Sequence, residues 1–347
     1  MDMSKSRLLR KGDYVYGSFF KPEVVDGYIN GVNPGDRSDI LGRFPFSEAS
    51  VDEAVDFAGI GMRAWRRTAI SARQAAVKRY RDHLVRYQER LAALCTRETG
   101  KPLWESRQEV LATVRSLDLL LTKGLEMLSP KILSDIGARS NRLPRGVVAI
   151  VCPYNFPIRI PSVQAAAAML AGNAVVLKPS KFTPAVGQEL ATLWDRCSLP
   201  RGVFNLIHGP GSVIGQRLVT HPELDALVFT GNYTTASAIR RLTSDHPELP
   251  MVMQCGGKGI SIVLDDADIE CAVYETVVGA FISAGQRHNS TARVLVTEGI
   301  YNQFVEHLIR RTAQLEVGYG FEQNTFMGPL ISENLRSRYR RFCRRLA

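Results

Sequence analysis

The sequence lacks the features that mark membrane, secreted and metal-binding proteins. No run of 18 apolar residues occurs, so no membrane span is expected. The basic first residues are not followed by an apolar stretch, so no secretory signal is predicted. The six cysteines form no CxxC pair, which favours free thiols in a reducing compartment over disulfides or a zinc site. We therefore expect a cytoplasmic protein that contacts no membrane and binds no metal.

Acidic residues are scarce only at the two ends of the chain. The net charge is +10, of which residues 336–347 contribute +6 and residues 1–12 contribute +3. The remaining residues carry only +1, which excludes the basic body typical of nucleic-acid-binding proteins. The arginine-rich end could bind an acidic partner, but a solvated amphipathic helix is the simpler interpretation. We do not expect nucleic acid as a partner.

The 347 residues, 45% of them hydrophobic, are enough for two domains. Ser50 is expected to cap a helix that continues to residue 65. Apolar residues three and four positions apart then predict one long helix over 71–99. Gly100 and Pro102 are expected to end it.

From residue 146 onwards, short β-branched runs alternate with helical stretches. The expected strands are VVAIV (147–151), AVVLK (174–178), VFNLI (203–207), ALVF (226–229) and ISIVL (260–264). This alternation predicts an α/β fold with a doubly wound parallel sheet covered by helices on both faces. Residues 134–146 depart from the alternation and are expected to form an extended arm.

A glycine-rich segment, HGPGSVIG (208–215), follows one of these strands. Gly211 and Gly215 would allow backbone amides to approach a phosphate group. The spacing GxGxxxG does not match the dinucleotide fingerprint, however, so an ordinary turn is an equal alternative.

Seven motifs follow one another along the chain. They are RETGKPLWES (97–106), CPYNFPIRIPS (152–162), AGNAVVLKPSKFTP (171–184), LPRGVFNLIHGPG (199–211), FTGN (229–232), QCGGK (254–258) and SAGQRHNSTARVLV (283–296). Their order and spacing resemble the aldehyde dehydrogenase superfamily. RETGKP, PYNFP and FMGPLISE (326–333) are most similar to its succinylglutamate-semialdehyde dehydrogenase branch.

This resemblance implies a fold and an activity. The fold would comprise an NAD(P)-binding domain (1–133 and 147–254), an oligomerisation arm (134–146) and a truncated α/β catalytic domain (255–347). The activity would be NAD(P)-dependent oxidation of a small-molecule aldehyde or semialdehyde to a carboxylate. The family's reaction uses a cysteine nucleophile, an oxyanion-binding asparagine and a glutamate general base.

Several residues match the family's cofactor-binding positions, with departures. Lys178 matches the lysine that holds the adenosine ribose, but Lys181 stands where the family has a ribose-binding glutamate. An ammonium cannot accept from ribose hydroxyls and favours a 2′-phosphate. Lys178, Ser180 and Lys181 thus favour NADP over NAD, or no dinucleotide at all, and a solvent-facing lysine at position 181 is an equal alternative.

The FTGN motif matches the turn that meets the cofactor's pyrophosphate. It consists of Phe229, Thr230, Gly231 and Asn232. Asn232 replaces the family's serine and is expected to cap the following helix equally well. Ala236 replaces a glycine, and its methyl group is expected to crowd the pyrophosphate.

The two positions that carry the family's chemistry differ here, although Asn155 matches the oxyanion asparagine. His288 stands at the position of the nucleophilic cysteine, and Gln254 at the position of the general base. Loss of a nucleophile can reduce kcat by on the order of 10⁶, and loss of a general base by about 10²–10⁴. We therefore expect an impaired or inactive enzyme.

Other interpretations stay open. His288 could attack an aldehyde itself, or a partner chain could complete an active oxidoreductase. Alternatively, the chain is a non-catalytic binding or assembly protein that reuses the fold.

The chain is also shorter than family members, and half a catalytic sheet would leave strand edges open. Such edges are costly in water, so a homo-oligomer is expected.

Overall fold

The computed structural model describes residues 11–346, so most of the basic N-terminal segment lies outside it. A seven-stranded sheet has the order β11-β10-β7-β8-β9-β1-β2. Its parallel strands are β7 (Val147–Val151), β8 (Ala174–Lys178), β9 (Phe204–Leu206), β10 (Ala226–Gly231) and β11 (Met251–Cys255). β1 (Asp13–Val15) pairs antiparallel with β9 and with β2 (Ser18–Phe20). The predicted α/β class and parallel sheet are confirmed.

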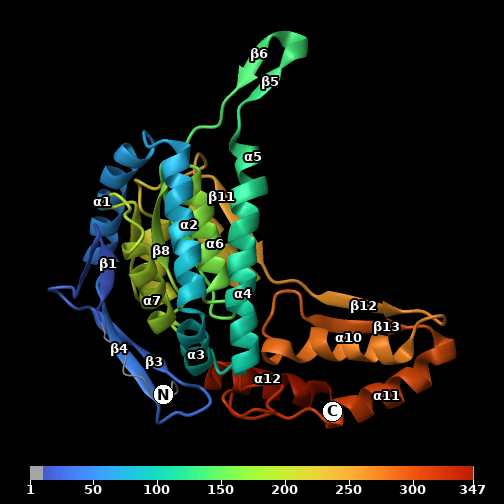
Figure 1. Ribbon diagram of the computed structural model, residues 1–347. Helices are drawn as coiled ribbons and strands as arrows, with labels where there is room; N and C mark the ends of the chain where they lie inside the picture. The colour runs from blue at the N-terminus through green and yellow to red at the C-terminus, as the bar shows by residue number, and fades with distance from the viewer. Residues whose placement is uncertain (1–10, 347) are drawn as a thin grey trace.

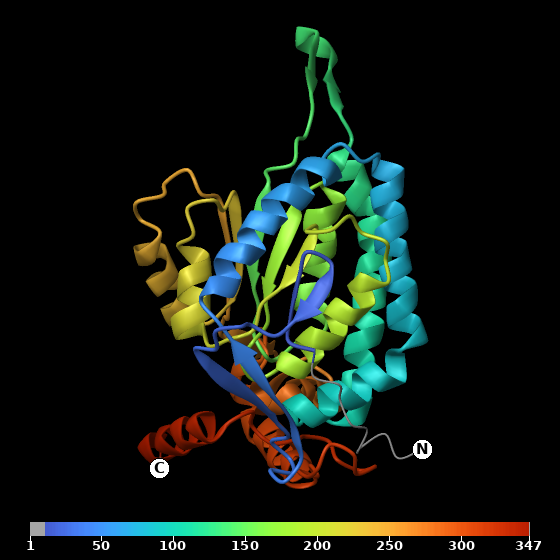
Figure 2. The ribbon, with the colours of Figure 1, turned by 90° about the vertical axis from the view of Figure 1, so that its left-hand side faces the viewer.

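Helices cover both faces of this sheet. α6 (Arg159–Leu170) and α7 (Pro184–Asp195) connect parallel strands, whereas α1 (Ala49–Trp65) crosses β7, β8 and β9 on the opposite face (Figure 2). An outer layer packs on α6 and α7 and comprises α2 (Ile70–Arg86), α3 (Gln88–Thr99) and α4 (Leu103–Leu119) (Figure 1). Stacking of Tyr80 on Trp194, with ring centroids 3.7 Å apart, ties this layer to the core. The other elements of this part are β3 (Gly27–Val32), β4 (Ile40–Phe46), α8 (Gln216–Val219) and α9 (Tyr233–Leu242).

Two expectations about the early helices are wrong. The helix predicted over 71–99 is divided into α2 and α3, because the backbone leaves the helical conformation at Tyr87. The break allows α2 to pack on α6 while α3 packs on α7 and β3. Ser50 does not cap α1, which begins at Ala49 and buries Ser50 in its first turn. Gly100 does end α3, with φ of 78°.

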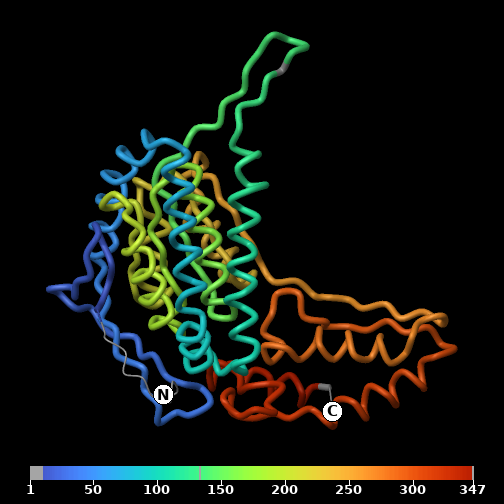
Figure 3. The backbone as a smooth tube through the Cα atoms, viewed as in Figure 1, coloured from blue at the N-terminus to red at the C-terminus, as the bar shows by residue number. Residues whose placement is uncertain are grey.

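A hairpin projects from the body between α4 and β7 (Figures 1 and 3). A π-helical turn at 120–124 and α5 (Leu125–Leu128) lead into β5 (Lys131–Leu133), which pairs antiparallel with β6 (Ala138–Ser140). Residues 134–146 form the tip, the second strand and the return to the body. Ile136 and Leu143 are 73% and 78% exposed, so this segment packs little against its own chain.

After β11, the chain forms a second, smaller sheet with its own hydrophobic cluster. Its elements are β12 (Gly259–Val263), β13 (Thr291–Val296), α10 (Ile269–Phe281) and α11 (Tyr301–Ala313). The two strands are parallel, and α10 and α11 cover one face around Val263, Val273 and Phe304. The other face exposes apolar side chains, among them Ile260 and Ile262.

The last element is α12 (Glu333–Leu346), which follows a loop after α11. None of the helices within residues 11–346 is long and apolar enough to cross a membrane.

Candidate functional site

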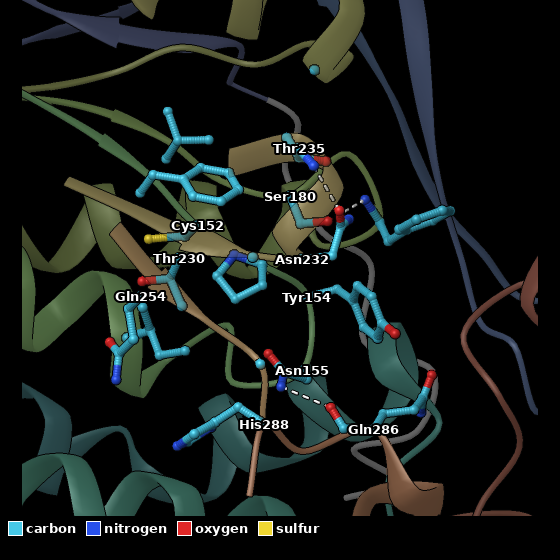
Figure 4. A pocket seen from close by; sticks show the side chains of 18 of the residues that line it. Cys152, Tyr154, Asn155, Ser180, Thr230, Asn232, Thr235, Gln254, Gln286 and His288 are labelled. Atoms are coloured by element: carbon cyan, nitrogen blue, oxygen red, sulfur yellow. Dashed lines mark hydrogen bonds between the residues drawn. The ribbon is translucent and has the colours of Figure 1, made fainter. Parts of the chain in front are cut away.

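A cavity of about 670 Å³ opens where the strand order of the central sheet reverses (Figure 4). The chain passes from β7 to β8 on one side and, after β9, crosses to β10 on the other side of β7. Ligands of doubly wound sheets bind at the carboxyl ends of strands at such a switch point. The predicted site residues in its wall are Asn155, Lys178, Ser180, Lys181, Gly211, Phe229, Thr230, Gly231, Asn232, Gln254 and His288.

A second cavity, of about 560 Å³, adjoins the first. The two share part of their walls, including Gln254, Arg287 and His288. Glu105 of α4 and Arg159 of α6 line only the second cavity. Gln254 and His288 therefore lie where molecules in the two cavities would meet.

Asn155 lies in the loop between β7 and α6, close to residues 286–288 (Figure 4). Its Nδ2 donates to the carbonyl oxygen of Gln286 at 2.8 Å. Its Oδ1 is buried and has no hydrogen-bond partner among the described residues. The amide has the donor that a developing oxyanion requires, but that donor is engaged by the Gln286 carbonyl in this conformation.

A buried carboxylate on α4 holds the segment that carries His288. Glu105 is 2% exposed and accepts from the backbone amide of Ser283 at 3.1 Å and from its hydroxyl. It also pairs with Arg287 at 3.0 Å. Ser283 and Ala284 have φ of 58° and 53°, a left-handed conformation that is strained for residues other than glycine. The bonds to Glu105 stabilise this turn.

A second carboxylate on the same face of α4 holds the start of α6. Glu109 pairs with buried Lys101 at 2.6 Å. Its other oxygen accepts from the amides of Ile158 at 2.8 Å and Arg159 at 3.0 Å. No role is predicted from the sequence for Glu105 or Glu109, whose i, i+4 spacing places them on one face of α4.

Lys178 is buried at the carboxyl end of β8 and has no carboxylate partner among residues 11–346. Its ammonium donates to the carbonyls of Pro179 at 2.9 Å and Gly209 at 3.0 Å. Burial lowers the pKa of Lys178 to about 8, because desolvation penalises the charged form. An anionic or hydroxyl-bearing ligand in the cavity would supply the acceptor that the ammonium lacks.

Ser180 and Lys181 follow Lys178 in the cavity wall. The Ser180 hydroxyl accepts from the amide of Phe182 at 3.2 Å, which fixes the turn after β8. Lys181 is exposed, with its Nζ 5.2 Å from the centroid of the Phe182 ring, and forms no ion pair within residues 11–346. Its charge is therefore available to a ligand.

The glycine-rich turn offers fewer free backbone amides to a phosphate than its sequence suggests. The amides of Val213 and Gly215 both donate to the carbonyl of Pro210, at 3.3 and 3.2 Å, so neither is free for phosphate in this conformation. Gly211 lines the cavity, but Gly215 is buried and does not. A β-carbon at position 215 would lie 3.2 Å from Cε of Lys178, so Gly215 makes room for that side chain.

The end of β10 forms the opposite wall. The Thr230 hydroxyl accepts from Nε2 of Gln164 at 2.9 Å. Asn232 caps α9, as predicted, by accepting from the amide of Thr235 at 2.8 Å (Figure 4). The expectation that Ala236 crowds a ligand is wrong, because this side chain packs into the hydrophobic core and does not line the cavity.

Some wall residues had not been singled out from the sequence. They are chiefly the aromatic residues Tyr154, Phe182 and Tyr233, and Leu335 and Arg338 of α12. Most of the arginine-rich helix is exposed, in keeping with the expected solvated helix, and its first turns supply the residues that reach the cavity wall. A doubly wound sheet with two adjoining cavities at its switch point defines the class of α/β proteins that bind ligands at this edge of the sheet.

Comparison with known proteins identifies the family. The sequence model of the aldehyde dehydrogenase family matches residues 22–346. Alpha-ketoglutaric semialdehyde dehydrogenase of Bacillus subtilis is 34% identical over 326 residues, which cover 93% of this chain and 66% of the relative. N-succinylglutamate 5-semialdehyde dehydrogenase of Chromobacterium violaceum is 36% identical over 304 residues, 86% of this chain and 62% of the relative.

Solved structures of aldehyde dehydrogenases share the fold of this chain. Betaine aldehyde dehydrogenase of Staphylococcus aureus, in complex with NAD⁺, superposes with a TM-score of 0.91 at 27% identity, over 96% of this chain and 67% of that chain. The chain belongs to the aldehyde dehydrogenase family, whose members use NAD(P). It spans 62–66% of the length of the two semialdehyde dehydrogenases.

Proposed function

We propose that this chain binds a phosphorylated nicotinamide dinucleotide and a small aldehyde but oxidises the aldehyde at most very slowly. One observation carries the proposal: Gln254 and His288 occupy the junction of the two cavities, where a family member's chemistry would take place. An amide cannot serve as a general base near neutral pH, and an imidazole replaces the thiol. Asn155, which matches the oxyanion-binding asparagine of the family, lies close to them, and the pair of Glu105 and Arg287 holds the segment that carries His288.

The first cavity fits a dinucleotide that carries a 2′-phosphate. Lys178 is a buried cation with no counter-ion in the described part of the chain, and Lys181 is an exposed cation beside it in the wall. Both gain charge-assisted hydrogen bonds from phosphate, whereas neither can accept from a ribose hydroxyl. The dinucleotide would supply the hydride acceptor, and NADP is favoured over NAD.

The second cavity fits an aldehyde that also bears an acidic group. Arg159 lines it, is exposed and forms no ion pair within the described residues. A guanidinium suits a carboxylate geometrically and electrostatically. The names of the two semialdehyde dehydrogenases above give substrates of this kind.

We place the protein in the cytoplasm, where its free cysteines would stay reduced.

A direct test combines binding with turnover. Calorimetry should detect NADP⁺ binding that is tighter than NAD⁺ binding, while steady-state assays against a panel of semialdehydes stay at background with either dinucleotide. Robust turnover by the unaltered chain would refute impaired catalysis. Tighter binding of NAD⁺ would refute the assignment of Lys181.

A working oxidoreductase that uses His288 is the second candidate. The His288 side chain is exposed, lines both cavities and has no hydrogen-bond partner among the described residues. A neutral imidazole there could attack a carbonyl. If turnover is observed, its loss in His288→Ala, with retention in His246→Ala on the surface, would establish this route.

A further inference from the structure

The wall of the first cavity contains cations but no carboxylate. Four basic side chains line it: Lys178, Lys181, Arg287 and Arg338. Among the described residues, no Asp or Glu does so. The second cavity differs, because Glu105 and Glu109 stand in its wall beside Arg159 and Arg287. The charged side chains in the wall of the first cavity therefore favour anionic groups.

The charges at the two ends of this cavity come from different elements. Lys178 and Lys181 lie at and after the end of β8. Asn155, Gln286 and His288 lie together at the other end, away from Ser180 and Asn232 (Figure 4). α12 reaches this second end, because the amide of Ile331, just before the helix, donates to Oε1 of Gln286 at 3.3 Å.

Arg338 is the uncompensated cation at that end. Arg338 lines the cavity from α12, the helix that begins two residues after Ile331 and its bond to Gln286. Arg338 forms no ion pair within residues 11–346. Arg287, in contrast, is paired with Glu105 at 3.0 Å. Glu109 is likewise paired with Lys101, so neither carboxylate offsets Arg338.

The oxidised and reduced nicotinamide rings differ in charge. The oxidised ring is a cation and the reduced ring is neutral, whereas the phosphates are the same in both forms. If a dinucleotide binds as proposed above, with its 2′-phosphate near Lys181, its ring lies toward the junction with the second cavity. There it would meet Arg338, Gln254 and His288, and no unpaired carboxylate.

We propose that the first cavity binds NADPH in preference to NADP⁺, with Arg338 as the residue that disfavours the oxidised ring. The proposal rests on the dinucleotide-binding function above. Two like unit charges several ångströms apart in a partly solvated cavity correspond to a preference of about five-fold. Removal of the charge at position 338, or restoration of a carboxylate at position 254, should reduce that preference.

The experiment measures dissociation constants by calorimetry for NADPH, NADP⁺ and 2′-phospho-ADP-ribose, which lacks the ring. We expect NADPH to bind about five-fold more tightly than NADP⁺, and the ring-free compound to bind no more weakly than NADP⁺. Arg338→Gln and Gln254→Glu should each bring the NADPH-to-NADP⁺ ratio toward one. Arg340→Gln, on the same helix but outside the cavity wall, is the matched control and should preserve the ratio.

The possible failures are distinguishable. Equal or tighter binding of NADP⁺ would overturn the preference while leaving dinucleotide binding intact. A preference that survives in Arg338→Gln would overturn the role of this residue. Absence of binding by all three compounds would overturn the proposed function and this inference together.

Discussion

At the residue scale, the most unusual group is the Lys178 ammonium. Its partners among the described residues are two backbone carbonyls and no anion, and Lys181 and Arg338, which form no ion pair within residues 11–346, share its cavity. Burial of an ammonium without an anion costs free energy in the ligand-free protein, and a bound phosphate would offset this cost. The cost should be measurable as a dependence of stability on pH.

The Lys178 pKa is about 8 in the folded chain, below its ordinary value of 10.5. The penalty is therefore fully present below pH 8 and is lost as the pH rises through 10.5, because the unfolded chain then gives up the proton as well. Between pH 8 and pH 10, wild type should gain about 2 kcal/mol relative to Lys178→Met. Urea unfolding of both proteins at the two pH values measures this gain, and a constant difference would contradict it.

At the element scale, α4 organises the site from the wall of the second cavity. Its two buried carboxylates hold the start of α6 and the strained turn that carries His288. The strand positions were predictable from the sequence, because β-branched runs that are buried on both faces leave a clear pattern. The break at Tyr87 was not predictable, since the apolar stripe continues through it and only packing against α6 and α7 makes the helix divide.

Glu105→Gln should test this organisation. Replacing the carboxylate leaves Arg287 without its partner and weakens the bonds to Ser283, so a loss of about 1–3 kcal/mol in the free energy of unfolding is expected. Glu89→Gln removes an exposed pair with Arg107 and should cost less than about 0.5 kcal/mol. Urea unfolding compares the two variants, and equal losses would show that Glu105 does not hold the turn.

At the scale of the whole molecule, most of the wall of the first cavity was predictable from the sequence. The positive charge that Arg338 of α12 adds to this wall was not. The motifs named eleven wall residues, because they lie at the ends of recognisable strands. Arg338 comes from a helix far along the chain, and no local pattern indicates where α12 docks. The division into domains 1–133 with 147–254 and 255–347 stays a prediction, although each sheet has its own hydrophobic cluster.

The hairpin and the open face of the second sheet predict self-association. Ile132 and Ile136 on the hairpin, and Ile260 and Ile262 on β12, are all more than half exposed, and apolar surface of this kind is normally buried in an interface. Light scattering should show oligomers that persist at high salt, since charge-driven contacts of α12 would be screened. Ile132→Asp with Ile136→Asp should weaken them, whereas Ile70→Asp on α2 should not. A monomer at both salt concentrations would refute the expectation.

The central claim is that a dinucleotide cavity and an aldehyde cavity meet at residues that cannot carry out the reaction. Single-turnover kinetics, with protein in excess over NADP⁺ and a saturating acidic semialdehyde, test it most directly by following NADPH absorbance. Wild type should form no NADPH above background, and His288→Cys with Gln254→Glu should form a measurable amount by regaining the nucleophile and the base. A full turnover by wild type, at a rate equal to that of the double variant, would contradict the account.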